Sequence, residues 1–123
     1  MNEDFVTEHD QRHRLIRNYL QSSTGNTLEV ARAIRPSLEA FLRVACPEHF
    51  PPETRLGTFR SLCEQRVGSS DEILNSETTQ ELRDIVEFAN RFHHDTNPAW
   101  ESEVINDGEL QAFVRRTMNF IRP

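Results

Sequence analysis

The chain has 123 residues, 36% of them hydrophobic, and a formal net charge of −6. This length is enough for one hydrophobic core without disulfide or metal support, so we expect a single domain over residues 1–123. The acidic balance argues against tight nucleic-acid binding by the average surface. All fourteen basic residues are arginine, which excludes a P-loop ATPase site because that loop needs a lysine.

The first predicted element is a helix over residues 4–20, with a strongly polar middle. His9 and His13 lie four residues apart on one face of it. We interpret this pair as part of an exposed polar face and predict no metal site and no cofactor, since no third ligand is close in sequence. A turn follows, and Asn26 or Thr27 is expected to cap the next helix.

The second helix is predicted to run to about Ala45. Its apolar residues recur at helical spacing, and Pro36 interrupts the stripe without shifting its phase. We therefore expect one kinked helix, with two shorter helices as the alternative. Residues 46–54 contain three prolines and should form a rigid loop.

Three more predicted elements complete the chain. We expect a third helix over residues 55–67 and a short helical turn over residues 71–74. Two capping-box patterns, Thr78 to Glu81 and Asn106 to Glu109, are expected to open the fourth and fifth helices. The fold class is therefore all-α, an antiparallel bundle of four or five helices.

The predicted location of the protein rests on two features that its sequence lacks, a membrane-spanning segment and a signal peptide. The longest apolar runs are a few residues, too short to span a membrane, and the acidic N-terminus does not resemble a signal peptide. Cys46 and Cys63 belong to no recognisable motif, and we interpret them as reduced core residues, with a disulfide as the less favoured option. We expect a cytoplasmic protein with no membrane contact.

Arg35 and Glu39 form the first candidate site. They lie four residues apart, so their side chains can meet on one face of the second helix. An ordinary surface ion pair is the favoured interpretation. Both residues also flank the apolar stripe, which would place them in a groove near the edge of the core.

The second candidate site is the end of the fourth helix, residues 88–100. His93 and His94 point about 100° apart on a helix, so they cannot share one role. Structural roles are the simpler interpretation here: Arg91 can pair with Glu87, Asn90 and Asp95 suit a helix end and a turn, and Trp100 can anchor a loop. Base stacking is the alternative role for Trp100.

Together the two sites supply the groups for metal-free RNA cleavage. A base removes the proton of the ribose 2′-OH, an acid protonates the leaving 5′-oxygen, and an arginine stabilises the charge that develops on the phosphate. Histidine suits either proton transfer because its pKa is near neutral. The sites form one centre only if the second and fourth helices pack together.

Three segments resemble the C-terminal helical region of bacterial ABC-type ATPases of the PrrC/RloC anticodon nuclease group. They are an Arg-x-x-x-Glu helix at Arg35 to Glu39, an aromatic-proline loop at residues 46–50, and an Asn-x-Phe-x-His pattern from Asn90 to His94. The resemblance covers roughly residues 26–121. It implies a HEPN-like domain of a phage-defence ATPase, with an ATPase portion in the same or a partner protein.

The resemblance also implies residue roles. Arg35, Glu39 and His94 would be catalytic, with His93 the other candidate for the functional histidine. For the nuclease hypothesis as a whole, we expect Asn90, Arg91, His93 and Trp100 to bind the substrate, an RNA with tRNA as the target class. The alternative hypothesis is a non-catalytic helical module that forms a homodimer or docks a partner through an exposed apolar groove.

Overall fold

A computed structural model describes the backbone of residues 3–121 and the side chains of residues 10–121. Over this range the chain is helical and contains no strand, which confirms the all-α prediction. Its elements are five α-helices and one 3₁₀ turn: α1 (Glu3–Ser22), α2 (Thr27–Ala45), α3 (Leu56–Arg66), α4 (Ser76–Asn90), η1 (Trp100–Ser102) and α5 (Asp107–Ile121).

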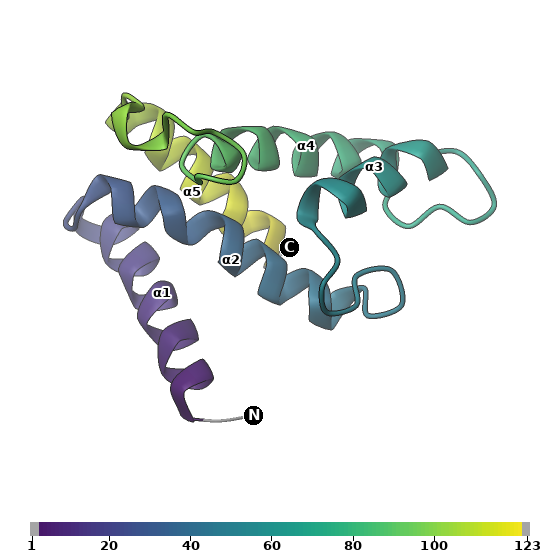
Figure 1. The fold of residues 1–123 in the computed structure, drawn as a ribbon, viewed down its shortest axis with the longest axis horizontal. Coiled ribbons are helices and arrows are strands. Elements are labelled where there is room, and N and C mark those ends of the chain that lie inside the picture. Colours follow the sequence, from purple (N-terminus) through teal and green to yellow (C-terminus); the bar gives the residue numbers. More distant parts are fainter. Residues whose placement is uncertain (1–2, 122–123) are drawn as a thin grey trace.

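Helix α2 lies at the centre of the bundle. It packs against α1, α4 and α5, while α3 packs on α4. Figure 1 shows α2 running between α1 on one side and the α3–α4 pair on the other. The helix begins as predicted, because the side chain of Asn26 accepts a hydrogen bond from the Glu29 N–H. It continues through Pro36, so the expectation of one helix rather than two is confirmed.

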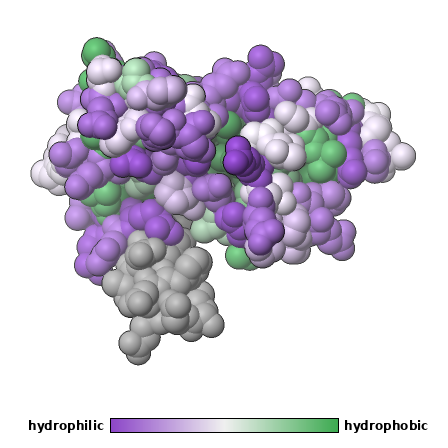
Figure 2. All heavy atoms as spheres, viewed as in Figure 1, coloured by the Kyte–Doolittle hydropathy of each residue, from purple (hydrophilic) through white to green (hydrophobic). Residues whose placement is uncertain are grey.

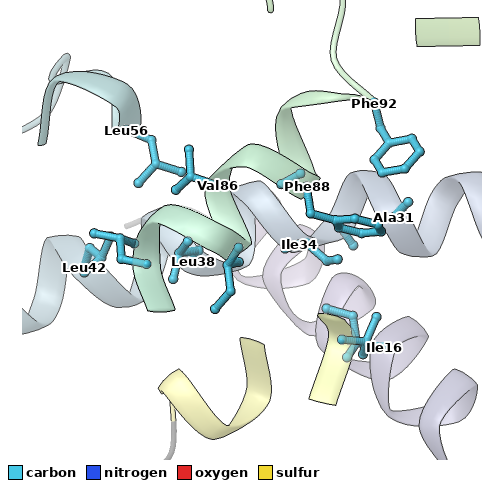
Figure 3. Close-up of a cluster of buried hydrophobic side chains, with 14 of the residues drawn as sticks. Ile16, Ala31, Ile34, Leu38, Leu42, Leu56, Val86, Phe88 and Phe92 are labelled. Atoms are coloured by element: carbon cyan, nitrogen blue, oxygen red, sulfur yellow. The ribbon is translucent and has the colours of Figure 1, made fainter. Parts of the chain in front are cut away.

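The core is formed by apolar residues from all five helices. Ile34 and Leu38 of α2, Ile85 of α4 and Val114 of α5 are fully buried. Figure 3 shows buried side chains of α2 and α4 pointing toward one another. The α2–α4 contact that the candidate site requires is therefore part of the hydrophobic core, whose burial is the main favourable term in folding.

The connection between α3 and α4 corrects two predictions. Residues 71–74 form turns and bends and no helix. Here the carboxylate of Glu72 accepts a hydrogen bond from the Gly68 N–H, and such local bonds compete with helix formation. The predicted capping box at Thr78 is also wrong: α4 starts at Ser76, and the Asn75 side chain accepts the Thr78 N–H.

Helix α5 begins where its capping pattern predicts. The Asn106 side chain accepts a hydrogen bond of 2.9 Å from the Glu109 N–H. The first residue of this helix also ties it to α1, since the hydroxyl of buried Tyr19 donates to the Asp107 carboxylate at 2.8 Å. Burial and this carboxylate together raise the pKa of Tyr19 to about 12.

The surface is largely hydrophilic on the face that Figure 2 shows. Within residues 3–121, no helix combines the length and the apolar character that a membrane crossing needs. Cys46 and Cys63 are both free thiols, as predicted, and Cys63 is buried. Burial raises the pKa of both thiols, that of Cys63 to about 11.

Candidate functional site at the junction of α2 and α4

Arg35 connects α2 to the end of α4. Its guanidinium donates to the Asp95 carboxylate at 2.7 Å and to the side-chain oxygen of Asn90 at 3.4 Å. The Arg35 side chain is 19% exposed and that of Asp95 is 54% exposed. The hydrogen bond from Arg35 lowers the pKa of Asp95, so this carboxylate is ionised at neutral pH. Asp95, which the sequence suggested only as a turn residue, is thus the main partner of Arg35.

Arg35 and Glu39 open onto the same cavity. Its volume is about 320 Å³, at the lower end of the range typical of small-ligand sites. Nine residues line it: Arg35, Glu39, Arg55, Leu56, Gly57, Thr58, Asn90, Asp95 and Thr96. Two segments more than 50 residues apart in sequence therefore contribute an arginine, a glutamate and an asparagine to one polar cavity.

The third contributor is the start of α3, which the sequence did not single out. Arg55 occupies the N-cap position, and its side chain makes no capping hydrogen bond. The first helical hydrogen bond comes from the Phe59 N–H, so the N–H groups of the three preceding residues have no helical acceptor. Those residues, Leu56 to Thr58, line the cavity. Uncapped N–H groups at a helix start favour anions. The only sequence signal was the absence of a capping side chain at position 55.

His93 lies partly buried beside α2. Burial, and then the charges of Arg35 and Arg32, lower its pKa to about 4, so the imidazole is neutral at pH 7. Its Nε2 is enclosed, and the described part of the chain offers that atom no hydrogen-bond partner. His93 is therefore close to the arginines of the site but poorly suited to donate a proton at neutral pH.

The structure places His94 differently from Arg35 and Glu39. Its side chain is exposed and lies outside the lining of the Arg35 cavity. The next residue in the chain, Asp95, does line the cavity. The backbone of His94 is thus next to the site, although its ring is not part of it.

Arg91 serves the loop rather than the cavity. It donates to the carboxylates of Glu103 and Glu109, each at 3.0 Å, and to the backbone oxygen of Val104. Glu103 also accepts a hydrogen bond from Asn97. The structure pairs Arg91 with these two glutamates, and Glu87, the partner considered from the sequence, pairs with Arg60 and Arg83.

Trp100 fastens the other end of the same loop to α2. The guanidinium of Arg32 lies 4.4 Å from the centre of its ring, a cation–π geometry. Trp100 thus has the anchoring role suggested from the sequence, and the face of the ring that Arg32 covers is not open for base stacking.

Within the described residues, no group of three or more His, Cys, Asp or Glu side chains is arranged to hold a metal ion. The side chain of His9, and with it the predicted polar face of His9 and His13, lies outside the described residues. Comparisons with protein-family models, with curated proteins and with solved structures find no match to this chain.

A second, larger concavity lies where α2 and α5 end and α4 begins. This groove has a volume of about 720 Å³, and its apolar residues are Phe41, Leu42, Ala45, Cys46, Ile73, Leu74 and Phe120. The rings of Phe41 and Phe120 meet edge to face across it, 6.1 Å apart. Glu77, Glu81 and Arg116 contribute charged groups to its lining.

Proposed function

We propose that the domain binds RNA at the Arg35 cavity and cleaves it without a metal ion. One observation carries this proposal: Glu39 lines the same cavity as two arginines and the uncapped start of α3. A phosphate needs cationic and N–H donors, and cleavage needs a base beside them. The likeness of Arg35 and Glu39 to the Arg-x-x-x-Glu helix of anticodon nucleases agrees with this assignment.

The proposed reaction is an internal transesterification. Glu39 takes the proton of the ribose 2′-OH, whose oxygen attacks the neighbouring phosphorus and forms a 2′,3′-cyclic phosphate. The bond to the 5′-oxygen breaks, and His94 donates the proton to that leaving group. Exposed side chains change rotamer within nanoseconds, so the ring of His94 can turn toward a bound strand. Arg35 and Arg55 stabilise the charge on the phosphate.

Asp95 acts as an internal competitor in this proposal. Its carboxylate holds the Arg35 guanidinium that the phosphate would occupy. A bound phosphate must therefore displace Asp95, which moves readily because its side chain is more than half exposed. Replacing Asp95 with asparagine removes the competing charge and should tighten RNA binding several-fold, measured by fluorescence anisotropy of a labelled RNA.

The activity is tested with tRNA and mixed RNA incubated in EDTA. Glu39→Gln and His94→Ala should abolish cleavage, because each removes one proton-transfer group. Glu48→Gln is the matched control, since it makes the same change at an exposed residue of the proline loop. Equal cleavage by all four proteins, including the wild type, would show a contaminating nuclease and remove the enzymatic proposal.

A second candidate function rests on the apolar groove: a non-catalytic module that docks an amphipathic helix. Two glutamates, Glu77 and Glu81, outnumber Arg116 among the charged residues of its lining, which gives the groove a net negative charge. The charge favours a basic helix of a partner, such as the ATPase portion implied by the resemblance, over a second copy of this acidic chain.

Sedimentation distinguishes the possible occupants of the groove. The chain should remain monomeric on its own, and adding the ATPase portion that the resemblance implies should produce a complex. Phe120→Ser should weaken that complex, because it removes an aromatic wall of the groove. Val104→Ser, at a residue 81% exposed outside the groove, should not. A domain that dimerises alone, or that ignores Phe120→Ser, contradicts this candidate.

A further inference from the structure

A third concavity lies between α1 and α2, outside the Arg35 cavity. Its volume is about 470 Å³, within the range typical of small-ligand sites. Among the side chains that the structure describes, its lining combines two guanidinium groups, a carboxylate, an amide and two apolar groups, from Gln11, Arg12, Leu15, Glu29, Arg32 and Ala33. We call it the α1–α2 crevice.

Arg12 carries an unmet hydrogen-bonding requirement in this crevice. Its side chain is partly buried, and its Nε is enclosed without an acceptor among the residues that the structure describes. A guanidinium remains charged at any physiological pH, so it cannot escape this cost by losing a proton. The enclosed Nε is out of reach of a ligand, but Arg12 lines the crevice, so an oxyanion there could accept hydrogen bonds from the terminal nitrogens of its guanidinium.

Arg32 supplies the second cation in a fixed position. Its guanidinium lies 4.4 Å above the ring of Trp100, which limits the rotamers that this long side chain can adopt. A cation held in place before binding loses less conformational entropy when a ligand arrives. The crevice therefore presents two guanidinium groups, one of which is oriented by its contact with Trp100.

The remaining lining residues narrow the chemistry of the ligand. The carboxylate of Glu29 repels an anion but accepts hydrogen bonds from hydroxyl groups. Leu15 and Ala33 offer an apolar wall. A ligand that matches all three features has a phosphate, hydroxyl groups and a flat apolar part.

We propose that the α1–α2 crevice binds a nucleotide unit. Arg12 and Arg32 hold the phosphate, Glu29 accepts hydrogen bonds from the ribose hydroxyls, and the base rests on Leu15 and Ala33. A free nucleotide and one nucleotide of an RNA strand share this chemistry. The site is independent of the Arg35 cavity, so it stands whether or not RNA is cleaved there.

Trp100 provides the readout. It is the only tryptophan of the chain and contacts Arg32, so a ligand on Arg32 should change its fluorescence. The probes are adenosine monophosphate, adenosine and a short single-stranded RNA, each titrated into the full chain. Adenosine monophosphate, the RNA or both should bind, whereas adenosine should bind much more weakly because it lacks the phosphate. The relative affinity of the first two identifies the natural source.

Matched variants separate this site from general electrostatic attraction. Arg12→Gln should raise the dissociation constant roughly tenfold, as expected for the loss of a charge-assisted pair. Arg14→Gln makes the same change at an exposed position of α1 outside the crevice and should have little effect. Gln11→Glu adds a negative charge at an exposed lining residue, and should weaken binding without a risk to folding.

Two results would overturn the proposal. The first is a wild-type chain that binds neither phosphate-bearing probe at millimolar concentration. The second is an equal loss of affinity in Arg12→Gln and Arg14→Gln, which would mean that only the net charge matters.

Discussion

His93 shows how position decides the chemistry of a residue. Adjacent histidines at the end of α4 have different environments: His93 is partly buried and faces the positive charges of Arg32 and Arg35, whereas His94 is exposed. The first is therefore a neutral imidazole at pH 7, and the second is the one that a substrate could reach. Helical spacing predicted that the two side chains diverge, but α4 ends at Asn90, so both histidines lie in the loop beyond it, and the sequence did not show which of them the core would enclose.

The depressed pKa of His93 predicts a pH-dependent stability. Its pKa is about 4 in the folded protein and 6.5 ordinarily, so the unfolded chain binds more protons between these values. The stability conferred by the neutral ring is complete above pH 6.5 and is lost as the pH falls toward 4, by an amount on the order of 1–3 kcal/mol. Denaturant unfolding of wild type and His93→Gln at several pH values measures it.

Comparing the wild type with His93→Gln separates the contribution of His93 to the pH dependence from that of the carboxylates. Asp95, Asp71 and Glu103 also have lowered pKa values, and their contributions are lost at still lower pH in both proteins. His94→Gln is the control and should keep the wild-type profile. A His93→Gln protein with an unchanged profile between pH 4 and 6.5 would show that the ring is hydrated in both states.

At the scale of the element, the start of α4 supports a test of helix capping. The side chain of Asn75 accepts the Thr78 N–H at 2.8 Å. Asn75→Ala should therefore cost about 1 kcal/mol of unfolding free energy. Thr78→Ala, at the position that the sequence pattern suggested as the cap, should cost clearly less. The two values come from urea denaturation, and the reverse order would mean that α4 begins at Thr78 in solution.

The hydrogen bonds of Arg91 hold the loop between α4 and α5 in place. Arg91→Ala removes hydrogen bonds to Glu103, Glu109 and the Val104 backbone. Because these side chains are partly exposed to solvent, we expect a loss of only about 1 kcal/mol. The rate of proteolytic cleavage within the loop should also be higher in this variant. Arg83→Ala removes an exposed pair within α4 and should leave both measurements unchanged, so a similar effect of the two variants would refute a specific role for Arg91.

For the whole molecule, the periodicity of apolar residues in the sequence predicted the helices, and the capping residues determine where those helices begin. The apolar stripes of α2, α4 and α5 indicated the buried faces because a helix must cover its apolar side. The pattern did not reveal the pairing of helices, since any two stripes can pack. Arg35, Asp95 and Arg55 illustrate the consequence: their meeting depends on how α2, α3 and α4 pack, and no local sequence pattern encodes that arrangement.

Pro36 gives the central helix a mechanical property. A proline has no backbone N–H, so the carbonyl oxygen of Arg32 receives no helical hydrogen bond from residue 36, and α2 is easier to bend there. Arg32 and Arg35 both lie in the turn that precedes Pro36, and they line different concavities, the α1–α2 crevice and the Arg35 cavity. Any change in the curvature of α2 at this turn therefore alters the spacing of the two guanidinium groups, although each belongs to a different concavity.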